Sequence, residues 1–174
     1  DAMVDVSLIE TGALKMQLAP YSLSEVVESA VQAVQTTAQE RDLSIAVRDL
    51  SDLPEVSVDR ARLEQVFVSL VSNAVKFTPD GGEISISGQL VEGPSGVRDV
   101  EVLVSDKGIG IPAKHLDKVF DPFFTTKDAD KGTGLGLAVA YGIIEKHRGH
   151  IRMESSPGQG TTCMIDLPIQ SEEK

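Results

Sequence analysis

The chain has 174 residues, of which 41% are hydrophobic and 25% are charged, and these proportions are typical of a folded globular protein. Its net charge of −11, from 16 basic and 27 acidic residues, argues against binding nucleic acid through a basic face. One cysteine excludes an intrachain disulfide and a multi-cysteine zinc site. Because the sequence has no apolar run of about 18 residues and no basic-then-apolar leader, we expect a soluble protein of a reducing compartment.

The first half of the chain is predicted to be mainly helical. Its opening stretch has apolar residues at helical spacing but no start signal, so we interpret it as the end of a helix that begins earlier. A second helix is expected after Ser22 or Ser24, since either is a good N-cap residue. The strongest periodic pattern follows Asp59, where apolar side chains recur every three or four residues up to Val75. In order, we expect a helix end at 1–14, a helix at 23–41, strands at 43–47 and 56–58, and a helix at 59–77.

The second half is predicted to be mainly β-structure. Two alternating runs are joined by Gly93-Pro94-Ser95-Gly96, which indicates a β-hairpin, and a second hairpin is expected around Pro157-Gly158-Gln159-Gly160. The expected elements are strands at 83–91 and 97–106, a short helix at 113–119, a helix at 135–147, and strands at 150–154 and 161–167. This content predicts a two-layer α/β (α+β) sandwich, in which three helices cover one face of a mixed, mainly antiparallel sheet.

Asp106 ends the strand at 97–106 and shares its parity with the apolar residues Val102 and Val104. Its carboxylate is therefore expected on the core-facing side of the sheet, where it is costly unless hydrogen-bond donors reach it. The glycines of Gly108-Ile109-Gly110 let the backbone turn and let a flat ligand approach. This arrangement fits recognition of an exocyclic amine such as that of adenine. For the residue alone, an aspartate that caps a turn is the simpler interpretation.

Glycines also open the helix at 135–147, in the run Gly132-Thr133-Gly134-Leu135-Gly136-Leu137. Free N–H groups and the positive end of the helix dipole suit an anion at such a start, and phosphate is the natural ligand. The spacing matches neither the Rossmann pattern nor the P-loop pattern. Taken alone, packing or flexibility explains such a run equally well.

Two polar residues lie beside the buried stripe of the helix at 59–77. The amide oxygen of Asn73 is a neutral, hard ligand suited to a magnesium ion that also holds phosphate oxygens. Lys76 is a point charge suited to the same phosphates. For either residue alone, a position at the boundary between buried and solvated faces is the better interpretation.

The remaining candidates are less specific. The aromatic cluster at 120–124 precedes a polar stretch, which is consistent with the base of a mobile lid or with a structural corner. His115, His147 and His150 have no metal-like spacing and are expected to be surface or structural residues. Cys163 shares strand parity with apolar neighbours and is expected to be a small core residue.

The order of these motifs is more informative than any one of them. They are Asn73-Ala74-Val75-Lys76-Phe77-Thr78-Pro79, Asp106-Lys107-Gly108-Ile109-Gly110-Ile111, Phe120 to Lys127, and Gly132 to Leu137. In this order and spacing they resemble the asparagine box, first glycine box, phenylalanine box and second glycine box of the catalytic ATP-binding domain of sensor histidine kinases. The resemblance covers about residues 20–168, and Leu8-Ile9-Glu10-Thr11-Gly12 is similar to the end of that family's dimerisation and phosphoacceptor hairpin.

The resemblance implies a Bergerat-type fold that binds ATP with Mg²⁺. Asp106 is then expected to bind the adenine amine, with Thr161 nearby. Asn73 is expected to hold magnesium and Lys76 to contact phosphate. The residues that the resemblance assigns to ATP binding are Asn73, Lys76, Phe77, Asp106, Gly108, Gly110, Ile111, Phe120, Thr125, Thr126, Lys127, Gly132, Thr133, Gly134, Leu135, Gly136, Leu137 and Thr161.

The same resemblance implies partners. The γ-phosphate is expected to pass to a histidine on the dimerisation hairpin and then to an aspartate on the receiver domain of a response regulator. The family's phosphoacceptor motif is absent, so no acceptor histidine is assigned and the chain is expected to be a fragment. We expect residues 1–14 to be the remnant of the hairpin, 15–170 the catalytic domain and 171–174 a tail. The fragment is expected to be monomeric and the full-length protein a homodimer, cytoplasmic or the cytoplasmic part of a membrane-bound sensor.

Two departures from the family pattern bear on function. The family often has Asn where this chain has Ser69, which bears on one contact on the magnesium side. Lys107 replaces the usual Asn or Thr of the first glycine box, and its side chain is expected to point outward.

Two alternative functions use the same motifs. The first is a superfamily ATPase like gyrase, which carries a Glu at the position of Ser69 to activate water, and a hydroxyl is a poor base there. The second is a non-catalytic ATP-binding module used for regulation or docking, which the intact Asp106, Asn73 and glycine boxes argue against.

Overall fold

The computed structural model describes residues 2–93, 96, 98–122, 124 and 135–169. The helices are α1 (Ala2–Glu10), α2 (Leu23–Glu40), α3 (Arg60–Phe77), α4 (Ala113–Leu116) and α5 (Gly136–Lys146). The strands are β1 (Ala19–Tyr21), β2 (Ser44–Arg48), β3 (Val56–Val58), β4 (Glu83–Glu92), β5 (Arg98–Asp106), β6 (His150–Ser156) and β7 (Gly160–Pro168). Within this described part of the chain, no helix has both the length and the apolar character needed to cross a membrane.

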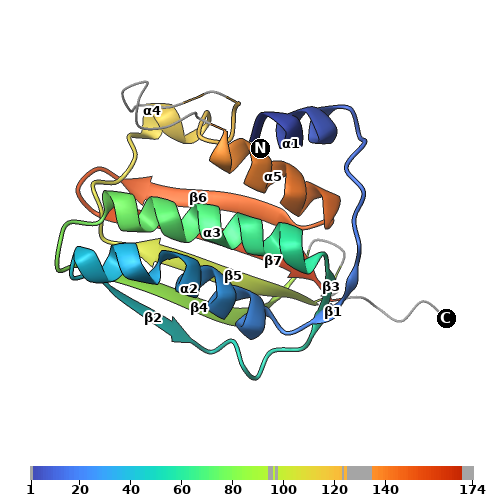
Figure 1. Cartoon of the computed structure of the whole chain (residues 1–174), viewed down its shortest axis with the longest axis horizontal. Helices are drawn as coiled ribbons and strands as arrows, with labels where there is room; N and C mark the ends of the chain where they lie inside the picture. The colour runs from blue at the N-terminus through green and yellow to red at the C-terminus, as the bar shows by residue number, and fades with distance from the viewer. Residues whose placement is uncertain (1, 94–95, 97, 123, 125–134, 170–174) are drawn as a thin grey trace.

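The main sheet has five strands in the order β2-β4-β5-β7-β6. Strand β2 pairs with β4 in parallel, and the other neighbours are antiparallel. Helices α2, α3 and α5 lie side by side on one face of this sheet (Figure 1). The predicted two-layer sandwich with a mixed, mainly antiparallel sheet is confirmed.

Strand β1 was not predicted. It contains Pro20, has three residues and pairs with β3 in a separate two-stranded sheet. A segment this short offers no alternation to detect, and proline is rare in strands other than edge strands. The helix after residue 22 begins at Leu23 with Ser22 as its N-cap residue, although the Ser22 side chain makes no capping hydrogen bond.

The core lies between the sheet and the three covering helices. In β5, Val100, Val102 and Val104 are buried and face the helices, as their strand parity predicts. On α3, the whole predicted apolar stripe from Leu63 to Val75 is buried. Helix α3 packs against both α2 and α5, so it is the central helix of the layer. The last turn of α3 therefore forms one wall of any cavity at that end of the sheet.

Helix α1 packs against α5 and is also held by polar contacts with α3 (Figure 1). The Asp5 carboxylate accepts hydrogen bonds from Arg62 at 3.0 Å and from the Gln65 amide at 2.8 Å. The side chain of Ile9 fills the space beside Gly142, where an added Cβ would lie 2.5 Å from an Ile9 methyl group. Helix α1 is therefore packed against α5 and hydrogen-bonded to α3. The division of the chain at residue 14 stays a prediction.

A buried histidine joins the start of α3 to the end of α5. His147 is 7% exposed, and its Nε2 accepts a hydrogen bond from the Asp59 N–H at 3.0 Å. Its Nδ1 must then carry the proton, which it donates to the Ile143 carbonyl at 2.8 Å. The Asp59 carboxylate caps α3 at the Arg62 N–H and also accepts from the Gln17 N–H. His147 is thus a structural residue, as expected, and it is neutral in the fold.

We predict that this histidine makes the fold acid-sensitive. Burial lowers the pKa of His147 from its ordinary value of 6.5, so below pH 6.5 the unfolded chain binds a proton that the folded chain resists. The contribution of His147 to the free energy of unfolding should therefore be constant above about pH 6.5 and fall as the pH drops toward its lowered folded-state pKa, so it is measured as the difference between the wild type and a His147 variant. Urea unfolding of the wild type and of His147→Ala between pH 5 and 8 measures this.

In His147→Ala the free energy of unfolding at pH 7.5 should fall by about 1–3 kcal/mol, because the Asp59 N–H is left unpaired. Its free energy of unfolding should also decrease less steeply than that of the wild type as the pH falls from about 6.5 to about 5. The matched control is His150→Ala, since His150 is exposed on β6. An acid limb of equal slope in His147→Ala would contradict the assignment.

Candidate functional site

A cavity of about 390 Å³ opens between the C-terminal half of α3, the end of β5, the loop after β5 and the start of α5. This volume is in the range of small-molecule sites in proteins. The structure brings nine of the predicted residues together around it, namely Asn73, Lys76, Phe77, Asp106, Gly110, Ile111, Gly136, Leu137 and Thr161. These residues come from segments of the chain far apart in sequence, so the grouping was not dictated by local pattern.

Asp106 is the acceptor at the end of β5, on the same side of the strand as Val104. Its carboxylate accepts a hydrogen bond from the Gly108 N–H at 2.8 Å. Burial raises the pKa of Asp106, whereas hydrogen bonds from the main chain at Gly108 and Thr161 lower it. The register pairs Asp106 with Thr161 across β5 and β7, which is the proximity expected from the sequence. A half-buried carboxylate is thus presented to a mainly apolar cavity.

The turn after Asp106 is possible because it contains glycine at two critical places. A Cβ on Gly108 would lie 2.6 Å from the Phe77 carbonyl oxygen, so the end of α3 and this turn are in direct backbone contact. Gly110 has φ +75°, and a Cβ there would lie 2.0 Å from the Ser156 carbonyl oxygen. Larger residues would push the three segments apart. The Lys107 side chain is exposed, as expected.

Hydrogen bonds tie this turn to the β6–β7 hairpin. The Gly158 N–H donates to the Ile109 carbonyl at 2.8 Å, and the Ile111 N–H donates to the Ser155 hydroxyl at 2.7 Å. The Ser155 hydroxyl in turn donates to the Gly160 carbonyl at 2.8 Å. The carboxylate of Asp106 is therefore held by a turn that is itself fixed on two sides.

The polar wall opposite Asp106 comes from α3. Asn73 is half-buried and Lys76 is exposed, and both line the cavity. Ser69, one turn before Asn73, also lines it and lies close to the first residue of α5, since a Cβ on Gly136 would be 3.7 Å from the Ser69 hydroxyl oxygen. A hydroxyl at this position is not a general base near neutral pH.

The donor set bears on a divalent metal. Among the described residues, no group of three or more His, Cys, Asp or Glu side chains is placed to hold a metal ion. The candidate metal ligand that the protein offers in this cavity is the neutral amide oxygen of Asn73. This fits a magnesium ion that takes its other ligands from phosphate oxygens and water, as Mg²⁺ commonly does.

Three predicted residues are described by the structure but do not line the cavity. Gly108 supports the Asp106 turn, Leu135 is 1% exposed just before α5, and the Phe120 ring packs against the Tyr141 ring at a centroid distance of 5.4 Å. Six further predicted residues, Thr125, Thr126, Lys127, Gly132, Thr133 and Gly134, lie outside the described residues.

Several residues that line the cavity were not predicted from the sequence as site residues. His115, expected to be a surface or structural residue, lines it, and its Nδ1 is buried without a hydrogen-bond partner in the described structure. The His115 ring meets Phe124 edge-on at 5.4 Å. Met153 on β6 and Cys163 on β7 supply apolar surface, and burial raises the pKa of Cys163 to about 12, so its thiol stays protonated. Strand parity places Cys163 inward, but no local pattern marks His115 or Met153.

Comparison with known proteins agrees with this geometry. The family model described as "Histidine kinase-, DNA gyrase B-, and HSP90-like ATPase" matches residues 58–171. The sensor histidine kinase ZraS of Escherichia coli (strain K12) is 36% identical over 159 residues, which cover 91% of this chain and 33% of ZraS. The chain thus spans one third of the length of that relative.

Solved structures of histidine kinases have the same fold. Full-length ShkA in complex with AMPPNP superposes with a TM-score of 0.85 and 24% identity, over 99% of this chain and 35% of ShkA. The histidine kinase ThkA in complex with the response regulator protein TrrA has a TM-score of 0.76 and 25% identity, over 99% of this chain and 48% of ThkA. The chain therefore belongs to the family of histidine kinase-, DNA gyrase B- and HSP90-like ATPases, as a catalytic ATP-binding domain of the sensor histidine kinase type.

Proposed function

We propose that this domain binds Mg-ATP and donates the γ-phosphate to a histidine on a dimerisation domain, from which it passes to a response regulator. The observation that carries the proposal is the placement of the Asp106 carboxylate and of the Asn73 and Lys76 side chains around one cavity. Support comes from the related structures, since ShkA was solved with AMPPNP and ThkA with the response regulator protein TrrA.

The base end of the nucleotide is assigned to Asp106. Its carboxylate accepts from the adenine amine, and Thr161, its partner in the β-ladder, lies beside it. Apolar surface from Ile109, Met153 and other residues covers the base. Recognition of an amine by a half-buried acceptor favours adenine over a base that presents a carbonyl there, because two acceptors would face one another.

The phosphate end is assigned to α3 and the start of α5. Lys76 neutralises phosphate charge, and the first residues of α5, Gly136 and Leu137, line the cavity at the positive end of the helix dipole. Asn73 would hold the magnesium ion, which supplies charge neutralisation of the phosphates. The protein's contribution to phosphoryl transfer is then mainly positioning and electrostatic stabilisation.

No acceptor for the phosphoryl group is assigned on this chain. None of the three histidines lies in the family's phosphoacceptor motif. Both ring nitrogens of His147 are engaged inside the fold, His150 is exposed on β6, and His115 lines the cavity without that motif around it. We therefore place the acceptor histidine on a separate dimerisation domain, which makes the full-length protein a homodimer and this chain alone a monomer. We place the domain in the cytoplasm, which supplies ATP. The serine at position 69 disfavours rapid hydrolysis of ATP as the main function.

The Asp106→Asn variant tests the base assignment. An amide nitrogen turned toward the adenine amine leaves a donor facing a donor, and an unmet buried hydrogen bond costs about 1–3 kcal/mol, so ATP affinity should fall about five- to a hundredfold. Isothermal titration calorimetry measures this. The matched control is Asp166→Asn, which changes a carboxyl group on the far side of the same sheet and should bind ATP as the wild type does. Unchanged affinity in a folded Asp106→Asn variant would refute the assignment.

Transfer in trans tests the proposed activity. The chain should not label itself with γ-labelled ATP, but should label a helical hairpin from the parent protein that contains the acceptor histidine. The product should be acid-labile and base-stable, as a phosphohistidine is. Strong self-labelling of this chain, or fast hydrolysis of ATP without a partner, would instead indicate a stand-alone kinase or ATPase.

A further inference from the structure

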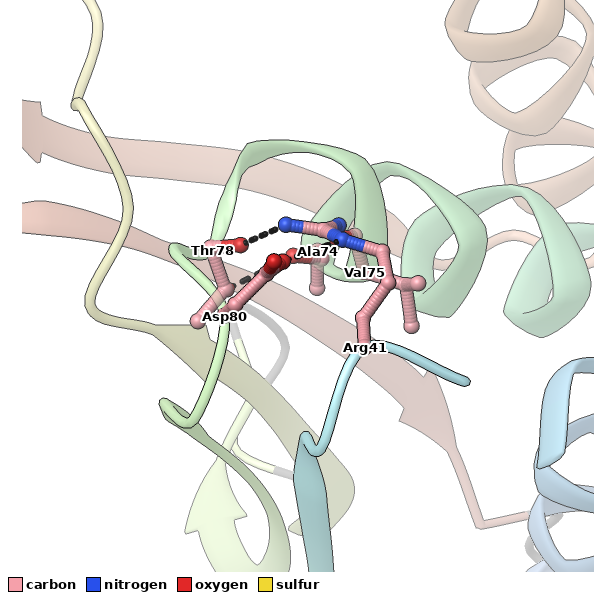
Figure 2. Close-up of polar contacts among 5 residues, drawn as sticks. All are labelled: Arg41, Ala74, Val75, Thr78 and Asp80. Atoms are coloured by element: carbon pink, nitrogen blue, oxygen red, sulfur yellow. Dashed lines mark hydrogen bonds and ion pairs between the residues drawn. The ribbon is translucent and has the colours of Figure 1, made fainter. Parts of the chain in front are cut away.

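The C-terminal end of α3 is held by an arginine from another element. Arg41, the residue that follows α2, extends its guanidinium group to the turn between α3 and β4 (Figure 2). The group donates hydrogen bonds to the main-chain carbonyls of Val75 and Thr78, and its Nε donates to the Asp80 carboxylate at 2.8 Å. The main chain adds to this contact, since the Gly81 N–H donates to the Arg41 carbonyl at 3.1 Å.

This contact adds to the local cap at the end of α3. The last carbonyls of a helix lack partners within it, and many helices satisfy them with a glycine in the left-handed conformation. Helix α3 instead ends at Thr78 in an extended conformation, with φ −81° and ψ 131°. The Ala74 carbonyl accepts from both the N–H and the hydroxyl of Thr78, and Arg41 donates to the carbonyl of Val75 in the last turn and to that of the C-cap residue Thr78. A fixed positive charge also suits the negative end of the helix dipole.

The helix end that Arg41 holds is the one that lines the cavity. Asn73, Lys76 and Phe77 are all in its last two turns. The carbonyl of Phe77 lies against Gly108 in the turn that positions the Asp106 carboxylate. The place of this helix end therefore sets the spacing between the polar residues of α3 and Asp106.

We propose that Arg41 is a positioning residue for the phosphate end of the bound nucleotide. It does not line the cavity itself. It fixes the last turn of α3, and through that turn it orients the Asn73 amide and the Lys76 ammonium group toward the phosphates. The planar guanidinium group is suited to this task because it donates to two carbonyls at once in a fixed geometry, which a lysine ammonium group does not reproduce.

The inference rests on the proposed ATP site, and its test compares two ligands. Calorimetric titrations with Mg-ATP and with adenosine separate the phosphate end from the base end. In Arg41→Ala, Mg-ATP affinity should fall about tenfold, comparable to the loss of one charge-assisted contact, while adenosine affinity changes less than about twofold. Arg41→Lys should show a smaller loss in the same direction. Hydrogen exchange over residues 74–78 should be faster in the nucleotide-free variants.

Two control variants isolate the carbonyl contacts. Asp80→Ala removes an ion-pair partner whose side chain is 76% exposed, and Arg48→Ala removes an exposed arginine from β2 that lies 3.7 Å from Glu83. Solvent-exposed ion pairs contribute little to the stability of a fold, so both control variants should bind Mg-ATP and adenosine as the wild type does.

Three results would overturn the inference. They are unchanged Mg-ATP affinity in folded Arg41→Ala, equal losses for Mg-ATP and adenosine, and a loss in Asp80→Ala as large as that in Arg41→Ala. If Arg41→Ala does not fold, Arg41→Lys decides alone, and an unchanged ratio of the two affinities refutes the proposal. Failure of the wild-type chain to bind ATP would refute the proposed function instead.

Discussion

The contact between the Phe77 carbonyl and Gly108 is the constraint on which the rest of the site depends. It joins the end of the central helix to the turn that follows the central strand, and it leaves no room for a side chain at position 108. Asn73 and Lys76 lie on one side of this contact and Asp106 on the other. A ligand that reaches both sides must therefore match a spacing set by backbone packing, which is far stiffer than side-chain rotamers.

The surrounding fold keeps this contact in place from three directions. The β6–β7 hairpin holds the loop after Asp106 through Gly158 and Ser155, and Arg41 holds the end of α3. At the opposite end of the helix layer, His147 joins the end of α5 to Asp59 at the start of α3. Helix α3 is thereby tied to the end of α2 at its C-terminal end and to the end of α5 at its N-terminal end. The carboxylate and the polar face of α3 are pre-organised before a ligand arrives, which lowers the cost of ordering them on binding.

Much of the fold and part of the site follow from local patterns in the sequence. Apolar periodicity located α3 within one residue, and strand parity placed Asp106 on the core side. Both succeed because side chains return to the same face about every 3.6 residues in a helix and every two residues in a strand, so each element shows the pattern several times. The role of Arg41 could not be read in this way, since it contacts carbonyls 34 and 37 residues away. His115 was likewise missed, because its place in the cavity depends on how α4 sits beside Phe124 and the other walls.

In the proposed function, one cavity receives both ends of ATP, with the base at Asp106 and the phosphates between α3 and α5. A crystal structure of this chain with a non-hydrolysable ATP analogue and magnesium would decide whether both ends of ATP bind there. The adenine amine is expected within hydrogen-bond distance of the Asp106 carboxylate, and the phosphates are expected beside Asn73, Lys76 and the first residues of α5. A nucleotide bound elsewhere, or one whose base lies away from Asp106, would contradict it.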